Sequence, residues 1–315
     1  MVHYFYAVRN MKSEKGLIIL GFILISLIWG STWLAIKIGL GSISPFYGIA
    51  IRFTIASIIL YLIMQMRGER LARDKKSILL YMNLAVLSFS FPFALVYWGE
   101  QYIASGLASV LFAAYPFVVA VSSHLFLSNE KLTAGKITGI ILGFVGVVII
   151  FWADINISSS NTLGMVAILL STVMQGFSLV IVKRMNHPIS PTSLSLGGMI
   201  FGIVIMYPIA IIFEDFSKLN FDAAGVGSML YLGTFGSIVT FVVYYWLLKR
   251  VEVVYLSLVS FVTPIFAVIL GAIWLKESLS PNIVLGASFV LFGIIIANSN
   301  DILRTIKYRR GKSST

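Results

Sequence analysis

Residues 30–61 read GSTWLAIKIGLGSISPFYGIAIRFTIASIILY, and residues 176–207 repeat the pattern of this stretch. A shift of 146 positions superimposes identical residues without a gap: Gly30 on Gly176, Lys37 on Lys183 and Tyr61 on Tyr207. Further along, a shift of 148 matches Tyr97-Trp98 with Tyr245-Trp246 and Pro116 with Pro264. Two unrelated apolar sequences would not keep a nearly constant offset over this length. The chain is therefore an internal duplication.

The composition is that of a helical membrane protein. Of the 315 residues, 59% are hydrophobic and 11% are charged, and the mean hydropathy is +0.97. The apolar residues form blocks long enough to span a bilayer as helices, whereas a transmembrane barrel would show short alternating segments. The absence of cysteine excludes disulfides and cysteine metal sites. The net charge of +11 does not indicate nucleic-acid binding, because the basic residues lie in short loops between apolar blocks.

The apolar blocks predict an all-α membrane protein with ten transmembrane helices. The first block follows basic residues but lacks the small-residue cleavage site of a signal peptide, so we expect it to remain as the first span. The predicted spans are 17–36, 46–66, 77–97, 105–127, 136–153, 163–182, 192–213, 226–248, 254–275 and 282–299.

The distribution of basic residues predicts the orientation. The loops on one side, which includes both termini, contain nineteen Lys and Arg residues, whereas the other side contains three. Because cytoplasmic loops are enriched in Lys and Arg, both termini are predicted to be cytoplasmic. Five spans per copy is an odd number, so the second copy enters the membrane from the opposite side. Such inverted-topology repeats are typical of secondary transporters, whose substrate site lies between the two halves.

The predicted organisation has four parts. They are a cytoplasmic N-terminus (1–16), a first repeat (17–153), a second repeat (163–299) and a basic cytoplasmic tail (300–315).

Several motifs resemble those of the drug/metabolite transporter superfamily, specifically its EamA-type branch. They are Trp29-Gly30-Ser31-Thr32-Trp33, Arg52-Phe53, Trp98-Gly99-Glu100-Gln101-Tyr102, Pro116, Pro264 and the Glu130-to-Gly146 and Glu277-to-Gly293 signatures. The resemblance covers residues 17–299. It implies ten helices in two EamA repeats and transport of small organic solutes, commonly amino acids or related metabolites, usually outward. It implies no particular substrate.

Arg52 is the one charged residue well inside a predicted span. A charge there costs roughly 2.5–3.5 kcal/mol on insertion scales, so the side chain should face the bundle interior and have a partner. It either meets a carboxylate of the solute or pairs structurally with a helix terminus or with Glu100. Glu100 and Gln101 are in turn candidates for a gate or an ion pair with Arg52, or are solvated loop residues.

Five further residues are candidates for the substrate site. Tyr97 and Tyr245 occupy matching positions and either line a cavity or pack. Trp33 lies on the first span, and Gln175 and Ser178 lie on the sixth span, its repeat partner. A polar amide inside a span lines a wet cavity or bonds between helices, and we favour the cavity for Gln175.

The remaining candidates concern coupling and movement. His124, near the end of the fourth span, could couple transport to protons or be solvated. Pro116 and Pro264 are expected to bend the fourth and ninth spans as hinges. Glu130 and Glu277 are expected to stabilise the N-termini of the helices that follow them.

These observations predict a plasma-membrane transporter of small organic solutes that exports them by alternating access around a central cavity. The predicted partners are a small-molecule solute and the lipid bilayer, with no nucleic acid and no cofactor, as a monomer or homodimer. The alternatives are a multidrug or cation exporter, and a non-transporting receptor, scaffold or intramembrane enzyme. Motifs of hydrolases, zinc enzymes and phosphate-binding loops are absent from the sequence, so no enzyme activity and no metal site are predicted.

Overall fold

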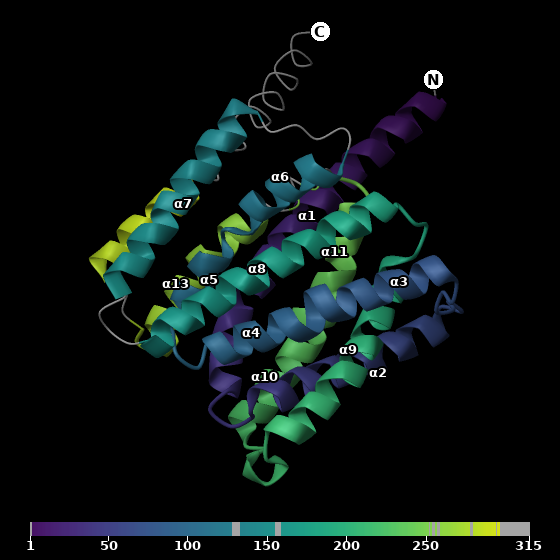
Figure 1. The fold of residues 1–315 in the computed structure, drawn as a ribbon. Helices are drawn as coiled ribbons and strands as arrows, with labels where there is room; N and C mark the ends of the chain where they lie inside the picture. Colours follow the sequence, from purple (N-terminus) through teal and green to yellow (C-terminus); the bar gives the residue numbers. More distant parts are fainter. Residues whose placement is uncertain are drawn as a thin grey trace.

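The computed structural model describes residues 2–127, 133–154, 159–251, 253, 256, 259–277, 280–293, 295 and 296. In this part of the chain every regular element is helical (Figure 1). The labelled α-helices are α1 (Val2–Gly39), α2 (Pro45–Met66), α3 (Lys75–Leu84), α4 (Phe91–Gly99), α5 (Ser105–Phe112), α6 (Tyr115–Phe126), α7 (Ala134–Asp154), α8 (Ser159–Met185), α9 (Pro191–Phe213), α10 (Ala223–Gly233), α11 (Thr240–Leu248) and α13 (Val259–Trp274). Two π-helical segments, η1 (Ala85–Ser90) and η3 (Thr234–Val239), and a 3-10 turn, η2 (Phe216–Lys218), complete the labels.

Seven helical segments of the described chain are long and apolar enough to cross a membrane, and they coincide with seven predicted spans. The other three predicted spans coincide with shorter apolar helices, Ala134–Ile150, Val262–Trp274 and Pro281–Gly293. The all-helical fold is therefore confirmed. The number of ten spans and the cytoplasmic placement of both termini stay predictions. The tail 300–315 and Glu130 lie outside the described residues.

The two repeats interlock rather than sit side by side. The first helix of the first repeat, α1, packs against α11 and α13 of the second repeat, and α8 packs against α4 and α6 of the first. At one edge α7 lies beside the helix Pro281–Gly293 (Figure 1). A Cβ atom on Gly146 would lie 2.5 Å from the carbonyl oxygen of Gly286, so glycine allows these two backbones to touch.

Two membrane spans contain a π segment at equivalent places. The segments η1 and η3 begin 149 residues apart and also end 149 residues apart. In the first copy Pro92 lies in the first turn of α4 and has no backbone N–H, so it cannot continue the series of helical backbone hydrogen bonds. In the second copy the hydroxyls of Ser237 and Thr240 donate to the carbonyls of Leu232 and Gly236. Such segments interrupt the helix and free backbone groups for other partners.

The fourth predicted span is two helices rather than one bent helix. α5 ends at Phe112, and α6 begins at Tyr115 with Pro116 in its first turn. Proline is well tolerated there, because the first N–H groups of a helix have no intrahelical partner. Pro116 therefore marks a helix start, whereas Pro264 lies inside α13 as expected.

Carboxylates from the second repeat bind helix N-termini of the first. Glu277 accepts hydrogen bonds from the backbone N–H groups of Ser105 (2.9 Å) and Gly106 (3.1 Å) and from the Ser105 hydroxyl (2.9 Å). The expectation that Glu277 serves the helix following it is thus corrected, because its carboxylate stabilises the N-terminus of α5. Glu214 does the same for α2.

Replacing Glu277 should destabilise the fold, because three donors at the start of α5 would lose a charged acceptor. We expect Glu277→Ala to lower the free energy of unfolding by about 2–3 kcal/mol. Denaturant unfolding of the purified protein in detergent would measure this loss. The control is Asp215→Ala, which removes an exposed carboxylate. Equal effects of the two substitutions would contradict a special role of Glu277.

Candidate functional site

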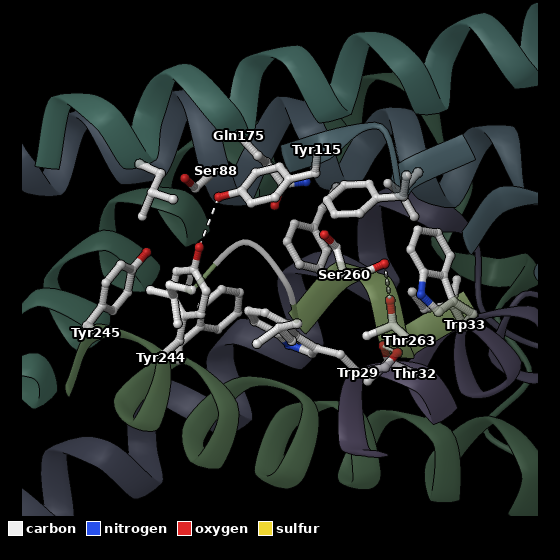
Figure 2. Close-up of a pocket in the computed structure, with 18 of the residues that line it drawn as sticks. Trp29, Thr32, Trp33, Ser88, Tyr115, Gln175, Tyr244, Tyr245, Ser260 and Thr263 are labelled. Carbon is white, nitrogen blue, oxygen red and sulfur yellow. Dashed lines mark hydrogen bonds between the residues drawn. The ribbon is translucent and has the colours of Figure 1, made fainter. Parts of the chain in front are cut away.

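A cavity of about 100 Å³ lies between the two repeats. Its walls come from α1, α2, η1, α4, α5, α6, α8, α11 and α13 and from Leu256. Aromatic side chains are the largest group in the lining: Trp29, Trp33, Phe93, Phe112, Tyr115, Phe241, Tyr244 and Tyr245. Polar side chains reach it from several directions: Thr32, Ser88, Gln175, Ser260 and Thr263 (Figure 2). Arg52 is a sixth polar lining residue. The cavity therefore combines an apolar surface with a few polar groups, as small-molecule sites usually do.

One hydrogen bond crosses the cavity from repeat to repeat. The hydroxyls of Tyr115 on α6 and Tyr244 on α11 lie 3.0 Å apart and point toward each other (Figure 2). Tyr244 also packs against Trp29, with ring centroids 5.1 Å apart, and Tyr115 stacks on Phe112. Ring contacts and this hydrogen bond thus connect α1 through α11 and α6 to α5.

Arg52 is 1% exposed, and the second repeat holds its guanidinium. Its Nε donates to the Ser237 hydroxyl and its Nη2 to the Gly236 carbonyl, both at 2.8 Å. Both acceptors belong to the π segment η3, and the Gly236 carbonyl accepts from the Thr240 hydroxyl as well as from Arg52. A longer bond of 3.4 Å joins Nη1 to the Tyr97 hydroxyl.

The structure also places the guanidinium over the ring of Phe93, 4.7 Å from its centroid. This contact is a cation–π interaction with a wall of the cavity. Arg52 is thus anchored on one side by η3 and borders the cavity on the other.

Glu100 immediately follows α4 and is completely buried. Neither oxygen of its carboxyl group has a hydrogen-bond partner among the described residues, so the expected direct pair with Arg52 is not formed in this conformation. Loss of hydration raises the pKa of the Glu100 carboxyl well above its ordinary value, and the positive charge of Lys37 only partly opposes this effect. Glu100 is therefore not a solvated loop residue. Gln101, by contrast, is exposed.

Lys37 and Lys183 perform the same task in the two repeats. Lys37 Nζ donates to the backbone carbonyls of Glu100 and Ile103, just beyond the end of α4. Lys183 Nζ donates to the carbonyls of Leu248 (3.0 Å) and Val251 (3.4 Å), at the end of α11. A cation at a helix C-terminus satisfies carbonyls that have no intrahelical donor.

The other predicted substrate-site residues divide into two groups. Trp33, Gln175 and Tyr245 line the cavity together with Arg52. Tyr97 and Ser178 are buried behind its wall, and Ser178 accepts hydrogen bonds from Asn83 (2.9 Å) and Ser88 (2.7 Å). Ser88 itself lines the cavity, so Ser178 contacts the lining indirectly by holding the Ser88 hydroxyl.

The residues predicted for coupling and bending lie outside the lining. His124 is exposed near the end of α6. Pro116 and Pro264 are buried next to lining residues, Tyr115 and Thr263 respectively. Their roles as proton carrier and hinges stay predictions.

Several lining residues were missed, although the repeat pointed to them. The shift of 148 that pairs Pro116 with Pro264 also pairs Tyr115 with Thr263, and both line the cavity. The shift of 146 likewise pairs Trp29 with Gln175. A comparison of the two residues aligned in each pair, keeping the pairs in which both residues are polar or aromatic, would have found these lining residues.

Comparison with known proteins agrees with this architecture. The model of the EamA-like transporter family matches residues 16–152 and 162–299, one match in each half of the chain. An uncharacterized transporter, YoaV of Bacillus subtilis (strain 168), is 29% identical over 280 residues, which cover 89% of this chain and 96% of that protein. An uncharacterized transporter of Archaeoglobus fulgidus is 30% identical over 268 residues, covering 85% and 94%.

Two further comparisons concern cellular context and fold. The uncharacterized inner membrane transporter YedA of Escherichia coli (strain K12) is 28% identical over 272 residues, covering 86% of this chain and 87% of that protein. A crystal structure with 17% sequence identity superimposes with a TM-score of 0.68 over 88% of this chain and 95% of the other, which shows a shared fold. Because the family model matches most of the chain, this protein belongs to the EamA-like transporter family of the drug/metabolite transporter superfamily.

Proposed function

We propose that this protein is a secondary transporter of the plasma membrane that exports amino acids or related small metabolites. The observation that carries the proposal is the cavity between two interlocked repeats, with a buried cation at its border. A site between inverted repeats suits alternating access, because rocking one repeat against the other exposes it to each side in turn. The relative named as an inner membrane transporter supports the location, and the family resemblance supports the outward direction.

The lining favours solutes that carry both a carboxylate and an apolar part. A guanidinium has five N–H donors, and the hydrogen bonds described above use three of them. Two donors of Arg52 thus stay available for a carboxylate, the group that arginine binds most specifically. The aromatic walls, including Trp29 and Trp33, would hold the apolar part.

Replacing Arg52 should impair transport of carboxylate-bearing solutes selectively. We expect Arg52→Gln to reduce amino-acid exchange in proteoliposomes roughly tenfold to a hundredfold, the loss that corresponds to one charge-assisted hydrogen bond. The amine that lacks the carboxylate but keeps the same side chain serves as the comparison solute. Arg52→Lys, which keeps the charge but not the fork geometry, should have an intermediate effect.

Thermal unfolding of the same variants separates recognition from folding. An equal loss of flux for the amino acid and its decarboxylated amine would show that Arg52 acts only through the stability of the cavity wall.

The hydrogen bond between Tyr115 and Tyr244 should influence the conformational change, because it joins the two repeats across the cavity. Removing one hydroxyl costs about 1 kcal/mol of interaction, so Tyr115→Phe and Tyr244→Phe should each change the exchange rate roughly fivefold. The double variant should change it no further, because either substitution already breaks the bond. Additive effects in this cycle would mean that the two hydroxyls act independently on the solute.

A further inference from the structure

The carboxyl group of Glu100 has no evident task in the folded structure. It is fully buried, and both of its oxygens lack a hydrogen-bond partner among the described residues. A buried polar group in this condition is costly, and native proteins keep few of them.

The second repeat shows that the fold does not need this carboxyl group. The shift of 148 that pairs Tyr97 with Tyr245 pairs Glu100 with Leu248. Lys183 nevertheless donates to the Leu248 carbonyl just as Lys37 donates to the Glu100 carbonyl. The lysine therefore stabilises the helix end whether or not a carboxyl group is present, and only the first repeat has a carboxyl group at this position.

Charged and titratable groups surround Glu100 without a direct bond to its carboxyl group. Lys37 on α1 and Arg52 on α2 favour the ionised form, and Glu277 opposes it, while Tyr97 lies one turn earlier on α4. The hydrogen bonds described above already engage the two cations and Glu277 elsewhere. Burial therefore dominates, and it favours the neutral form of the carboxyl group.

We propose that Glu100 is the proton-binding group of this transporter, and that it couples solute export to proton entry. The inference rests on the proposed transport function. In the conformation described here Glu100 holds one proton on its carboxyl group. When this end of the cavity opens, water and Lys37 can reach the group, and the proton is exchanged with the solvent.

The position of Glu100 links this exchange to the cavity. Val96, one turn earlier on α4, and Ile36, next to Lys37 on α1, both line the cavity. A movement of α1 against α4 that opens the cavity here would also uncover Glu100. On the topology predicted from the basic residues this end is the outer one, so Glu100 would take up its proton when the outer end opens. The proton would leave to the cytoplasmic side in the opposite conformation, when water enters the cavity from that side and reaches Glu100 past Val96 and Ile36.

Infrared spectroscopy of the purified protein tests the protonation without any transport assay. The wild type should show a band of a protonated carboxyl group that disappears as the pH rises. Glu100→Gln should lack this band, and Asp215→Asn, at an exposed carboxylate, should keep it. Identical spectra of wild type and Glu100→Gln at every pH would overturn the proposal.

The pH dependence of the folding equilibrium gives a second test, in which stability is expected to fall as the pH rises. Because burial raises the pKa in the folded state, the protonated group contributes stability at low pH, and this contribution is lost as the pH rises toward the folded-state pKa. The folding equilibrium of the wild type should therefore weaken by up to about tenfold per pH unit relative to Glu100→Gln. The same slope in both proteins would overturn the proposal.

Transport in proteoliposomes with a trapped pH-sensitive dye tests the coupling. Glu100→Gln should still exchange amino acids but lose the solute-driven proton flux, because glutamine does not bind a proton at these pH values. Glu100→Leu introduces the residue that the second repeat has at the equivalent position, Leu248. It should behave like Glu100→Gln, and agreement between the two variants would exclude a folding defect of one of them as the cause. His124→Ala should retain the proton flux.

The outcomes separate this inference from the transport function itself. A wild type that moves no amino acid would contradict the proposed function. A wild type that moves amino acids without protons would contradict only the coupling. If Glu100→Gln keeps the full proton flux, the assignment to Glu100 is wrong; if His124→Ala alone abolishes that flux, His124 is the carrier.

Discussion

Backbone groups at helix ends inside a bilayer must find partners within the protein, because lipid offers none. In this structure side chains from distant segments meet that requirement. Glu277 accepts from the start of α5, Lys37 and Lys183 donate to the ends of α4 and α11, and Arg52 donates to the interrupted helix at η3. Several of these bonds join the two repeats, so the same contacts that complete the helices also set the position of the cavity walls.

The scaffold is symmetric, but the chemistry is not. Equivalent positions contribute different side chains to the cavity, such as Trp29 against Gln175 and Tyr115 against Thr263. At the position of Arg52 the second repeat has Gly198, where a Cβ atom would lie 2.8 Å from Leu84. The first copy can hold a guanidinium because η3 offers acceptors, whereas the matching space beside Leu84 has no room for one. Duplication thus accounts for the shared helical arrangement, and divergence at a few positions accounts for the different side chains at the cavity.

The repeat, the helical class and part of the lining could be predicted from the sequence. Apolar blocks and a constant offset between the two copies can be recognised without knowledge of the packing. Trp33, Arg52, Gln175 and Tyr245 do meet at one cavity. The burial of Glu100 could not be predicted, since by hydropathy it lies at the end of a span and its burial depends on packing between distant helices. The bonds of Glu277 to α5 and the break before Pro116 were missed for the same reason, because they depend on three-dimensional contacts. The local sequence alone favoured a Glu277 that stabilises the helix following it and a single span bent at Pro116.

The paired π segments also bear on the history of the chain. A π segment fits an extra residue into a helix, which rotates everything beyond it relative to a continuous α-helix. Both copies contain such a segment at the same place, although different residues maintain it: Pro92 in one copy and the hydroxyls of Ser237 and Thr240 in the other. A shared irregularity with different local causes is best explained by inheritance from the ancestral half. The extra residue would then be older than the gene duplication, and the ancestral half already carried the π segment that now accommodates Arg52.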